Sequence, residues 1–162
     1  MARAATPAIA SLVAAGVDHD VLRYHHDPRA ESFGAEAAAA LAVSAGVHPA
    51  QVFKTLVIAI PTGLAVAVLP VTASLSLKAA AAALTVPKAV MADPAVAQRT
   101  TGYVVGGISP LGQRKSLPTV VDTSALNWGR VLCSAGKRGW DVSLPPADLV
   151  RLTGAVTADI QA

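Results

Sequence analysis

Two long apolar runs, residues 52–60 and 64–71, dominate the hydrophobic pattern of this chain. The segment Pro61-Thr62-Gly63 separates them, and a connection of this length and composition between two apolar runs is typical of a β-hairpin. Neither run alternates cleanly between apolar and polar residues. The pattern therefore predicts two paired strands that are covered on both faces.

Lys54 is the one charged residue in the first run. In a strand its side chain would share a face with Val52, Leu56 and Ile58. Two interpretations remain open. In one, the aliphatic stem is buried and the ammonium reaches water at the strand end. In the other, Lys54 lines a cleft, where partial loss of hydration makes the ammonium favour an anionic partner.

Shorter periodic segments and turn residues predict the remaining elements. Thr6, Ser32 and Asp93 are suitable N-caps, and Gly16 and Gly46 are suitable helix ends. The predicted helices span residues 5–15, 33–43, 75–84, 94–99 and 145–152. The further predicted strands span 17–25, 88–91, 119–122, 130–134 and 140–144, with turns at 127–129 and 136–139.

Length and composition predict one folded domain over residues 1–162, with 53% hydrophobic and 14% charged residues. Much of the hydrophobic content is Ala and few residues are aromatic, so we expect Val, Leu and Ile to form the core. No apolar run is as long as a membrane span, and the start of the chain has helical spacing rather than a signal-peptide pattern. The single Cys133 excludes an intrachain disulfide and fits a reducing compartment. We therefore expect a cytoplasmic protein with no membrane partner.

Charge is unevenly distributed along the chain. Residues 99–140 hold six of the 13 Lys and Arg residues but one of the 10 Asp and Glu residues. This basic excess predicts a polyanionic partner. The net charge of +3 is modest, so we expect a small footprint rather than a long wrapped nucleic-acid duplex.

The basic region contains a Gly-rich segment, residues 99–115. Gly106 and Gly107 allow positive φ and leave backbone N–H groups uncovered by side chains. Pro110 fixes φ just beyond them and favours an extended Ser109. The segment is either an ordinary tight turn or a site that binds an anion or a developing oxyanion.

A second turn, residues 134–139, repeats this combination of glycines and cations. It carries Ser134, Lys137 and Arg138, and Asp141 follows it. Lys137 and Arg138 fit either a solvated loop or, together with Lys54 and the first turn, a site for phosphate and carbonyl groups.

Several other chemistries are excluded or disfavoured. The glycines match neither a P-loop nor a dinucleotide-binding loop, and there is no Cys or His pair at zinc-ligand spacing. The neighbours His25 and His26 would point to opposite sides of a strand. Cys133 is expected to be a small buried hydrophobic residue, and no Ser has the context of a nucleophile elbow. We expect no metal and no cofactor.

Four segments resemble the YbaK/EbsC family of free-standing aminoacyl-tRNA deacylases, which share a fold with the editing domain of bacterial prolyl-tRNA synthetases. These segments are Phe53-Lys-Thr-Leu56, Met91 to Pro110 with its Val-Gly-Gly-Ile-Ser-Pro run, Leu117-Pro-Thr119 and Gly136-Lys-Arg-Gly139. The resemblance extends over nearly the whole chain and is closer to the cysteine-specific branch than to the alanine-specific relatives. Ala135, where the family pattern suggests Gly, and a helix near Lys78 that is poor in charge depart from it.

The resemblance implies a fold and a substrate. The fold would be α+β, with a curved, mixed and mainly antiparallel sheet flanked by helices. The substrate would be the 3′ end of a tRNA carrying the wrong amino acid, here Cys-tRNA(Pro), and prolyl-tRNA synthetase would be a partner. In the cysteine-specific branch the substrate thiol is thought to attack its own ester.

The resemblance also implies roles for individual residues. Lys54 would hold the terminal nucleotide or the ester, backbone N–H groups near Gly106 would polarise the ester carbonyl, and Asp141 would orient the substrate amine or a hydroxyl. The positions that would complete the substrate site are Tyr24, Phe33, Thr55, Gly107, Ile108, Ser109, Ser134, Lys137 and Arg138. For Phe33 the sequence supports two interpretations equally: its ring packs onto its own helix, or it forms a wall of the pocket.

Two alternative functions remain. The chain would remove alanine or another small amino acid from tRNA(Pro), or it would be a non-catalytic module that binds the tRNA 3′ end. The volume of the pocket decides between cysteine and another small amino acid. The intact Lys54 and Gly106-Gly107 argue against a non-catalytic module.

Overall fold

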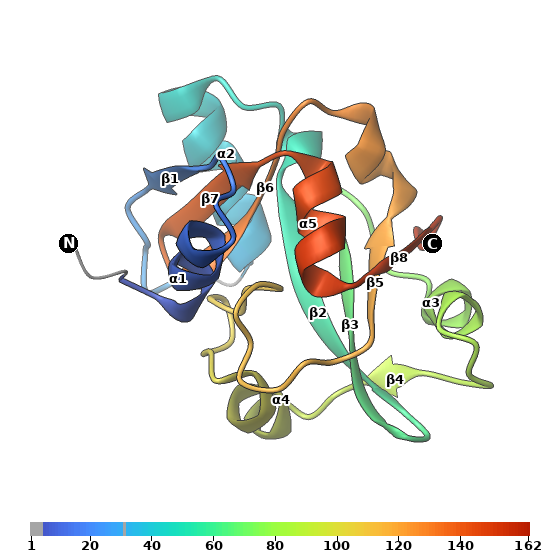
Figure 1. The fold of residues 1–162 in the computed structure, drawn as a ribbon. Coiled ribbons are helices and arrows are strands. Elements are labelled where there is room, and N and C mark those ends of the chain that lie inside the picture. The colour runs from blue at the N-terminus through green and yellow to red at the C-terminus, as the bar shows by residue number, and fades with distance from the viewer. Residues whose placement is uncertain (1–4, 31) are drawn as a thin grey trace.

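A computed structural model describes residues 5–30 and 32–162 of the chain. Its strands form two sheets, and helices surround them (Figure 1). In chain order the elements are α1 (Pro7–Ala14), β1 (Asp20–Arg23), α2 (Phe33–Ala45), the 3₁₀ helix η1 (Pro49–Gln51), β2 (Phe53–Ile60), β3 (Gly63–Pro70), α3 (Leu77–Ala83), β4 (Val90–Met91), α4 (Pro94–Thr101), β5 (Thr119–Asp122), the 3₁₀ helix η2 (Thr123–Asn127), β6 (Val131–Lys137), β7 (Trp140–Leu144), α5 (Pro146–Thr153) and β8 (Val156–Ala158).

The predicted hairpin is the centre of the larger sheet, whose strand order is β4-β2-β3-β5-β8. β2 and β3 pair antiparallel over their full lengths, from Phe53 opposite Pro70 to Ile60 opposite Gly63. β4 adds antiparallel to β2, while β5 and β8 add in parallel on the β3 side. The sheet is mixed, as the fold class predicts.

The smaller sheet is antiparallel, with the order β1-β7-β6. A parallel bridge between Val52 and Leu132 joins the two sheets. The fold class is therefore confirmed as α+β, with the strands shared between two connected sheets.

The largest apolar cluster lies between the sheets. Phe53 and Val66 enter it from the larger sheet, Cys133 and Val142 from the smaller one, and Leu12 from α1. Most of its members are small aliphatic residues, which confirms that Val, Leu and Ile dominate the core. One continuous core thus connects the strands that carry the site.

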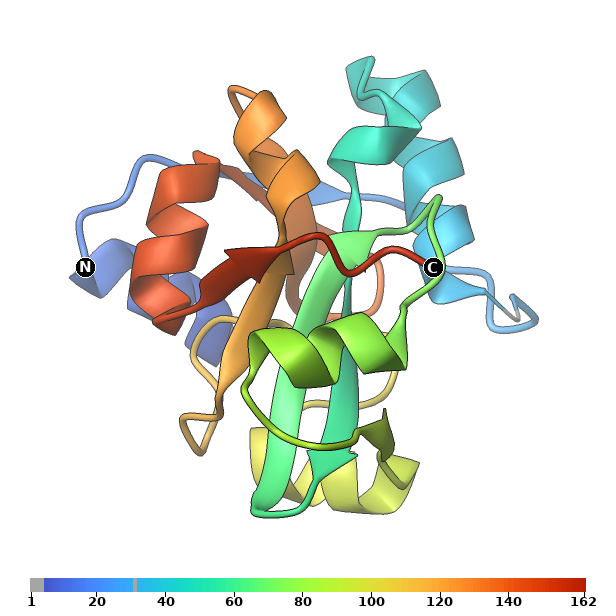
Figure 2. The ribbon, with the colours of Figure 1, turned by 90° about the vertical axis from the view of Figure 1, so that its right-hand side faces the viewer.

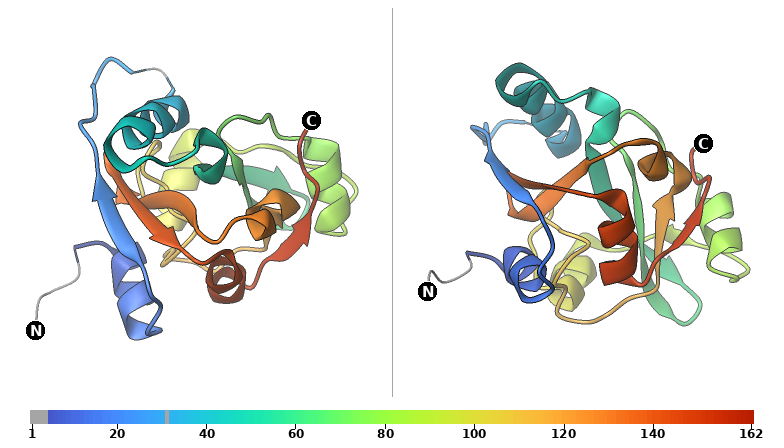
Figure 3. Two further views of the ribbon diagram at one scale, coloured as in Figure 1. Left: turned by 90° about the horizontal axis from the view of Figure 1, so that it is seen from above. Right: turned by 45° about the horizontal axis from the view of Figure 1, so that its top comes forward.

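The helices cover separate faces. α3 packs on the outer side of the β2–β3 hairpin (Figure 2). Ala80 of α3 shares a buried apolar cluster there with Ile58 and Leu69. α2 lies on one face of the smaller sheet, whereas α1 and α5 lie on the other (Figure 3). Among the described residues, no helix is long and apolar enough to cross a membrane.

The predicted N-caps are present. The side chains of Thr6, Ser32 and Asp93 accept hydrogen bonds from the first turns of α1, α2 and α4. The Thr6 hydroxyl also donates to the carbonyl of Ala135 at 2.6 Å, which ties α1 to β6.

Candidate functional site

A cavity of about 320 Å³ lies between α2, β2, the segment leading into α4 and the Gly-rich turn. Its walls are mainly apolar. The following predicted site residues line it: Tyr24, Phe33, Lys54, Thr55, Gly106, Ile108, Ser134 and Asp141. Segments that are far apart in the sequence thus meet in one site.

Asp141 is the buried acid of the cavity. It is 4% exposed, and its neighbour across the β6–β7 pair is Ser134. Burial raises the pKa of Asp141 to about 7, because no hydrogen bond or cation among the described residues offsets the lost hydration. Its carboxylate is therefore available to a ligand, and a cationic ligand would restore its charge.

Tyr24 and Thr55 are two further uncharged polar residues of the cavity. Burial, and then the charge of Asp141, raises the pKa of Tyr24 to about 12, so its hydroxyl stays protonated. The Thr55 hydroxyl is buried without a hydrogen-bond partner among the described residues. A buried hydroxyl in this state costs free energy unless a ligand or water completes its hydrogen bonding.

Lys54 lines the cavity from β2 and is half-buried. Burial lowers its pKa, and its ammonium donates to the backbone carbonyl of Ala73 at 2.7 Å. An ammonium has three donors, so two remain for a ligand. The structure favours the cleft interpretation of Lys54, because the ammonium is held by a neutral group instead of an acid.

Among the described residues, the Gly-rich turn has backbone N–H groups at the cavity wall that no acceptor takes, those of Gly106 and Ile108. The N–H of Gly107 donates to Val104 and that of Val105 donates to Gln98. Gly106 lines the cavity, and in the described part of the chain no acceptor takes its N–H. Gly106, rather than Gly107, is therefore the candidate oxyanion donor of this turn.

Close packing explains why both positions are glycines. Gly106 has φ +86°, and a Cβ there would lie 2.7 Å from the ring of Phe33. A Cβ at Gly107 would lie 3.0 Å from the backbone nitrogen of Arg138. The two turns predicted from sequence thus pack directly on each other, and Phe33 is a wall of the cavity.

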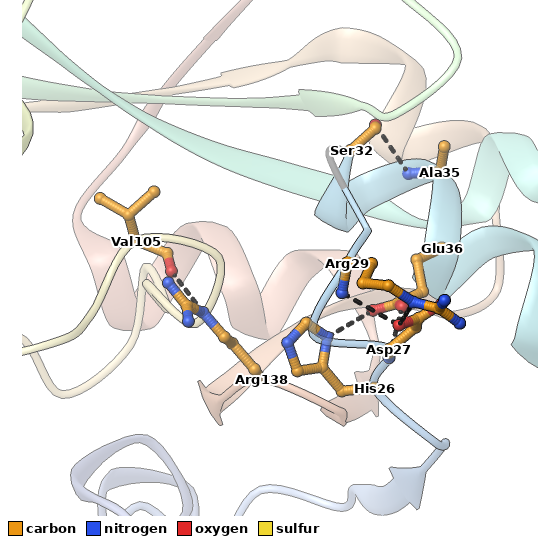
Figure 4. A network of polar contacts seen from close by, with 8 residues as sticks. All are labelled: His26, Asp27, Arg29, Ser32, Ala35, Glu36, Val105 and Arg138. Atoms are coloured by element: carbon orange, nitrogen blue, oxygen red, sulfur yellow. Dashed lines mark hydrogen bonds and ion pairs between the residues drawn. The ribbon is translucent and has the colours of Figure 1, made fainter.

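Arg138 joins these two turns from outside the cavity. Its Nε donates to the carbonyl of Val105 at 2.8 Å (Figure 4). Its guanidinium lies 4.8 Å from the centre of the Phe33 ring. The contacts place Arg138 against the back of the Gly106 turn. Its geometry is that of a positioning residue.

Three other predicted site residues also lie outside the cavity lining. Gly107 forms the turn, and Ser109 is fully buried, where its hydroxyl accepts a hydrogen bond from the N–H of Leu111. Lys137 lies 4.8 Å from the centre of the Trp140 ring. In this structure Ser109 shapes its own loop, and Lys137 belongs to the outer surface of the hairpin.

Sequence reasoning missed the pair formed by His26 and Glu36. His26 Nδ1 lies 2.7 Å from Glu36 Oε1, and the other carboxylate oxygen accepts the N–H of Asp27 at 2.8 Å (Figure 4). Burial raises the pKa of Glu36, but these hydrogen bonds lower it by more, so the net shift is downward. The His26 ring lies 5.8 Å from that of Phe33, so the pair supports the helix start that carries Phe33. No local pattern links two residues this far apart in sequence.

The described residues offer neither an accessible cysteine nucleophile nor a cluster of metal ligands. Cys133 is fully buried, and burial followed by the charge of Asp141 raises its pKa, so it is not an accessible thiolate. Among the described residues no three His, Cys, Asp or Glu side chains gather as a metal site would require.

An apolar cavity with a buried acid, a half-buried lysine and a glycine N–H is the candidate functional site of this α+β domain. Residues 34–152 match the family model of the aminoacyl-tRNA editing domain, and the chain belongs to this family. A protein of Enterococcus faecalis named as a Cys-tRNA(Pro)/Cys-tRNA(Cys) deacylase, EbsC, is 38% identical over 124 residues, which are 76% of this chain and 76% of that protein. The resemblance seen in the sequence motifs is confirmed.

Solved structures support the fold. The crystal structure described as a trans-editing enzyme for prolyl-tRNA synthetase has a TM-score of 0.79 at 24% identity, covering 96% of this chain and 95% of that one. That of a hypothetical protein has a TM-score of 0.83 at 27% identity, covering 97% of this chain and 100% of that one.

Proposed function

We propose that this chain hydrolyses the ester bond of mischarged Cys-tRNA(Pro). The observation that carries the proposal is the cavity that brings together Lys54, Gly106 and Asp141. The family match and the relative named as a deacylase support an aminoacyl-tRNA deacylase activity.

Each of the three groups has a role in this reaction. The ammonium of Lys54 holds the terminal nucleotide or the ester by charge. The N–H of Gly106 donates to the ester carbonyl as negative charge develops on its oxygen; losing one such donor costs about 10²–10³ in rate. The carboxylate of Asp141 accepts the substrate ammonium, which restores the charge that burial disfavours.

The nucleophile comes from the substrate. Among the described residues, no His or Cys lines the cavity to attack the ester or to activate Thr55 or Ser134. The substrate thiol loses its proton and its sulfur attacks the ester carbon. The bond to the ribose oxygen breaks, that oxygen takes a proton, and a cyclic thiolactone leaves and is then hydrolysed. Holding the thiol close to the ester in the reactive orientation lowers the activation free energy by about 7–11 kcal/mol.

This route also explains how a small apolar cavity selects cysteine. A difference of one methylene in an apolar pocket is worth only about 1–3 kcal/mol, so a proline-charging enzyme will accept cysteine by mistake. The same limit applies to an editing site that selects by size. Selection by the thiol itself avoids this limit, because alanine and serine lack that nucleophile.

The test is hydrolysis of Cys-tRNA(Pro), Ala-tRNA(Pro) and Ser-tRNA(Pro) by the unmodified chain, Lys54→Ala and the control Lys78→Ala, an exposed lysine on α3. We expect rapid loss of cysteine only. Lys54→Ala should lower kcat/KM about ten- to a hundredfold, the worth of one hydrogen bond from a charged group, while Lys78→Ala should change little. Cleavage of the serine ester at the cysteine rate would exclude thiol attack. Loss of alanine instead would change the specificity within the family, and binding without turnover would favour a non-catalytic module.

Prolyl-tRNA synthetase is the proposed partner, and the cytoplasm is the proposed location. A chain with a net charge of +3 offers little long-range attraction for tRNA, so the synthetase would supply tRNA selection. The same assay with Cys-tRNA(Cys) decides this point. If added synthetase left the two tRNAs equally good substrates, the partnership would be wrong.

A further inference from the structure

The outer surface of the β6–β7 hairpin carries two cations on one aromatic ring. The guanidinium of Arg23 lies 4.1 Å from the centre of the Trp140 ring, and the ammonium of Lys137 lies 4.8 Å from it. Strand register produces this arrangement, because Trp140 on β7 pairs with Arg23 on β1 and with Lys137 on β6. We refer to these three residues as the basic cluster.

The positive charge of the basic cluster is not neutralised by neighbouring acids. In the described ranges, 5–30 and 32–162, the ion pairs of arginine involve Arg29, Arg130 and Arg151, and none involves Arg23 or Lys137. Both residues are exposed. The face of a tryptophan ring attracts cations, so it holds two like charges close together. An anion beside them would be attracted by both.

The tip of the β6–β7 hairpin connects the basic cluster to Phe33, a residue of the cavity wall. Arg138 follows Lys137 directly, and its guanidinium lies over Phe33, which lines the cavity. Gly107 packs against the backbone of the same two residues. Alternation along β7 turns Trp140 to the face opposite Asp141 and therefore away from the cavity.

We propose that the basic cluster binds the sugar-phosphate backbone of the tRNA acceptor end while the aminoacylated terminal nucleotide occupies the cavity. The proposal rests on the deacylase function above and assigns a second contact, outside the cavity, to the same substrate. Phosphate is the expected ligand because the Trp140 ring already contacts two cations, which leaves it poorly placed to stack on a base. Contacts of this kind position the RNA without reading its sequence.

The test compares a long and a short substrate. The double variant Arg23→Gln/Lys137→Gln removes both charges, and the matched control Lys78→Gln/Lys88→Gln removes two exposed charges near α3, at the opposite side of the molecule (Figure 1). Each protein is assayed on Cys-tRNA(Pro) and on cysteinyl-adenosine, the isolated terminal nucleoside ester. Circular dichroism and thermal melting verify that each variant is folded.

We expect the double variant to lower kcat/KM on Cys-tRNA(Pro) at least tenfold at low salt, mainly through a higher KM. Its kcat/KM on cysteinyl-adenosine should stay within twofold of that of the unmodified chain. The slope of log(kcat/KM) against log[salt] should become shallower by about 1.4–1.8, because each of the two lost phosphate contacts removes about 0.7–0.9 from it. The control should match the unmodified chain on both substrates.

Three results would overturn the proposal: an unchanged rate on Cys-tRNA(Pro), an equal loss on both substrates, or an unchanged salt slope. If the unmodified chain cleaves neither substrate, the deacylase function fails separately. Binding of uncharged tRNA(Pro) to the same variants then tests the surface alone, and equal affinity for all three proteins would reject it.

Discussion

At the scale of the residue, Asp141 makes the stability of the fold depend on pH. Its pKa is about 7 because burial is not offset by a partner, whereas an aspartate in the unfolded chain has a pKa of about 3.9. Between these values the unfolded chain releases a proton that the folded chain keeps. The free energy of unfolding therefore falls as pH rises from about 4 to 7 and is level with respect to this group above that range.

The first prediction follows from this dependence. Asp141→Asn keeps the shape of the side chain and removes the titration, so the variant should gain stability relative to the unmodified chain as pH rises. A shift of about three pKa units corresponds to at most about 4 kcal/mol at pH 8, and none at pH 4. Urea unfolding at pH 4, 6 and 8 measures the difference. A constant difference across these pH values would show that Asp141 is ionised in the folded state throughout.

The structure brings together residues that the sequence and its motifs proposed for the site, but the sequence did not predict the direction of turn side chains. Lys54 and the Gly-Gly pair were candidates from the residue pattern, and the family resemblance gave Asp141 its role; Lys54, Gly106 and Asp141 line one cavity. Ser109 turned out to be buried within its loop and Lys137 to lie on Trp140. Turn residues have no fixed periodicity, and tertiary contacts decide where their side chains point.

At the scale of the element, the Gly106 turn depends on a neighbouring hairpin. Arg138 connects them through its hydrogen bond to Val105 and its contact with Phe33. A planar guanidinium makes both contacts at once, whereas an ammonium is a compact point charge that cannot stack as a plane. The Gly106 N–H would then be less well fixed in position.

The second prediction is that Arg138→Lys lowers kcat about tenfold with little change in KM. A misplaced N–H donor reduces the stabilisation of the transition state more than it reduces the binding of the substrate. The loss should be the same for Cys-tRNA(Pro) and for cysteinyl-adenosine. This pattern differs from that expected of the basic cluster, which affects the tRNA alone. A loss in KM on the long substrate only would mean that Arg138 contacts tRNA instead of positioning the turn.

The elements themselves were largely predictable, for physical reasons that also explain the misses. The hairpin and the capped helices follow local rules and were confirmed. β1 is Asp20–Arg23 rather than 17–25, because only this part pairs with β7. β8, Val156–Ala158, was not predicted, since three mostly exposed residues paired in parallel to β5 carry no hydrophobic pattern of their own.

At the scale of the whole molecule, one apolar core connects both sheets. Val66 and Val142, one from each sheet, are fully buried in the same cluster, and Leu149 of α5 joins them. Length and composition predict a single domain but do not show which faces meet, because long continuous apolar strands leave the partner of each face undetermined. The cavity lies between elements of both sheets, so its geometry depends on their remaining docked.

The last prediction concerns this dependence. The two tryptophans lie in different parts of the molecule, Trp140 on β7 of the smaller sheet and Trp128 just after η2, which contacts β3 of the larger one. Trp128→Phe and Trp140→Phe thus leave one fluorescent reporter in each part. A single shared core should make each variant unfold in urea in one transition, with the same midpoint by fluorescence and by far-ultraviolet circular dichroism. If the Trp140 signal changed at a lower urea concentration than the ellipticity of the same variant, the smaller sheet would be an independent unit, and the cavity would be lost before the larger sheet unfolds.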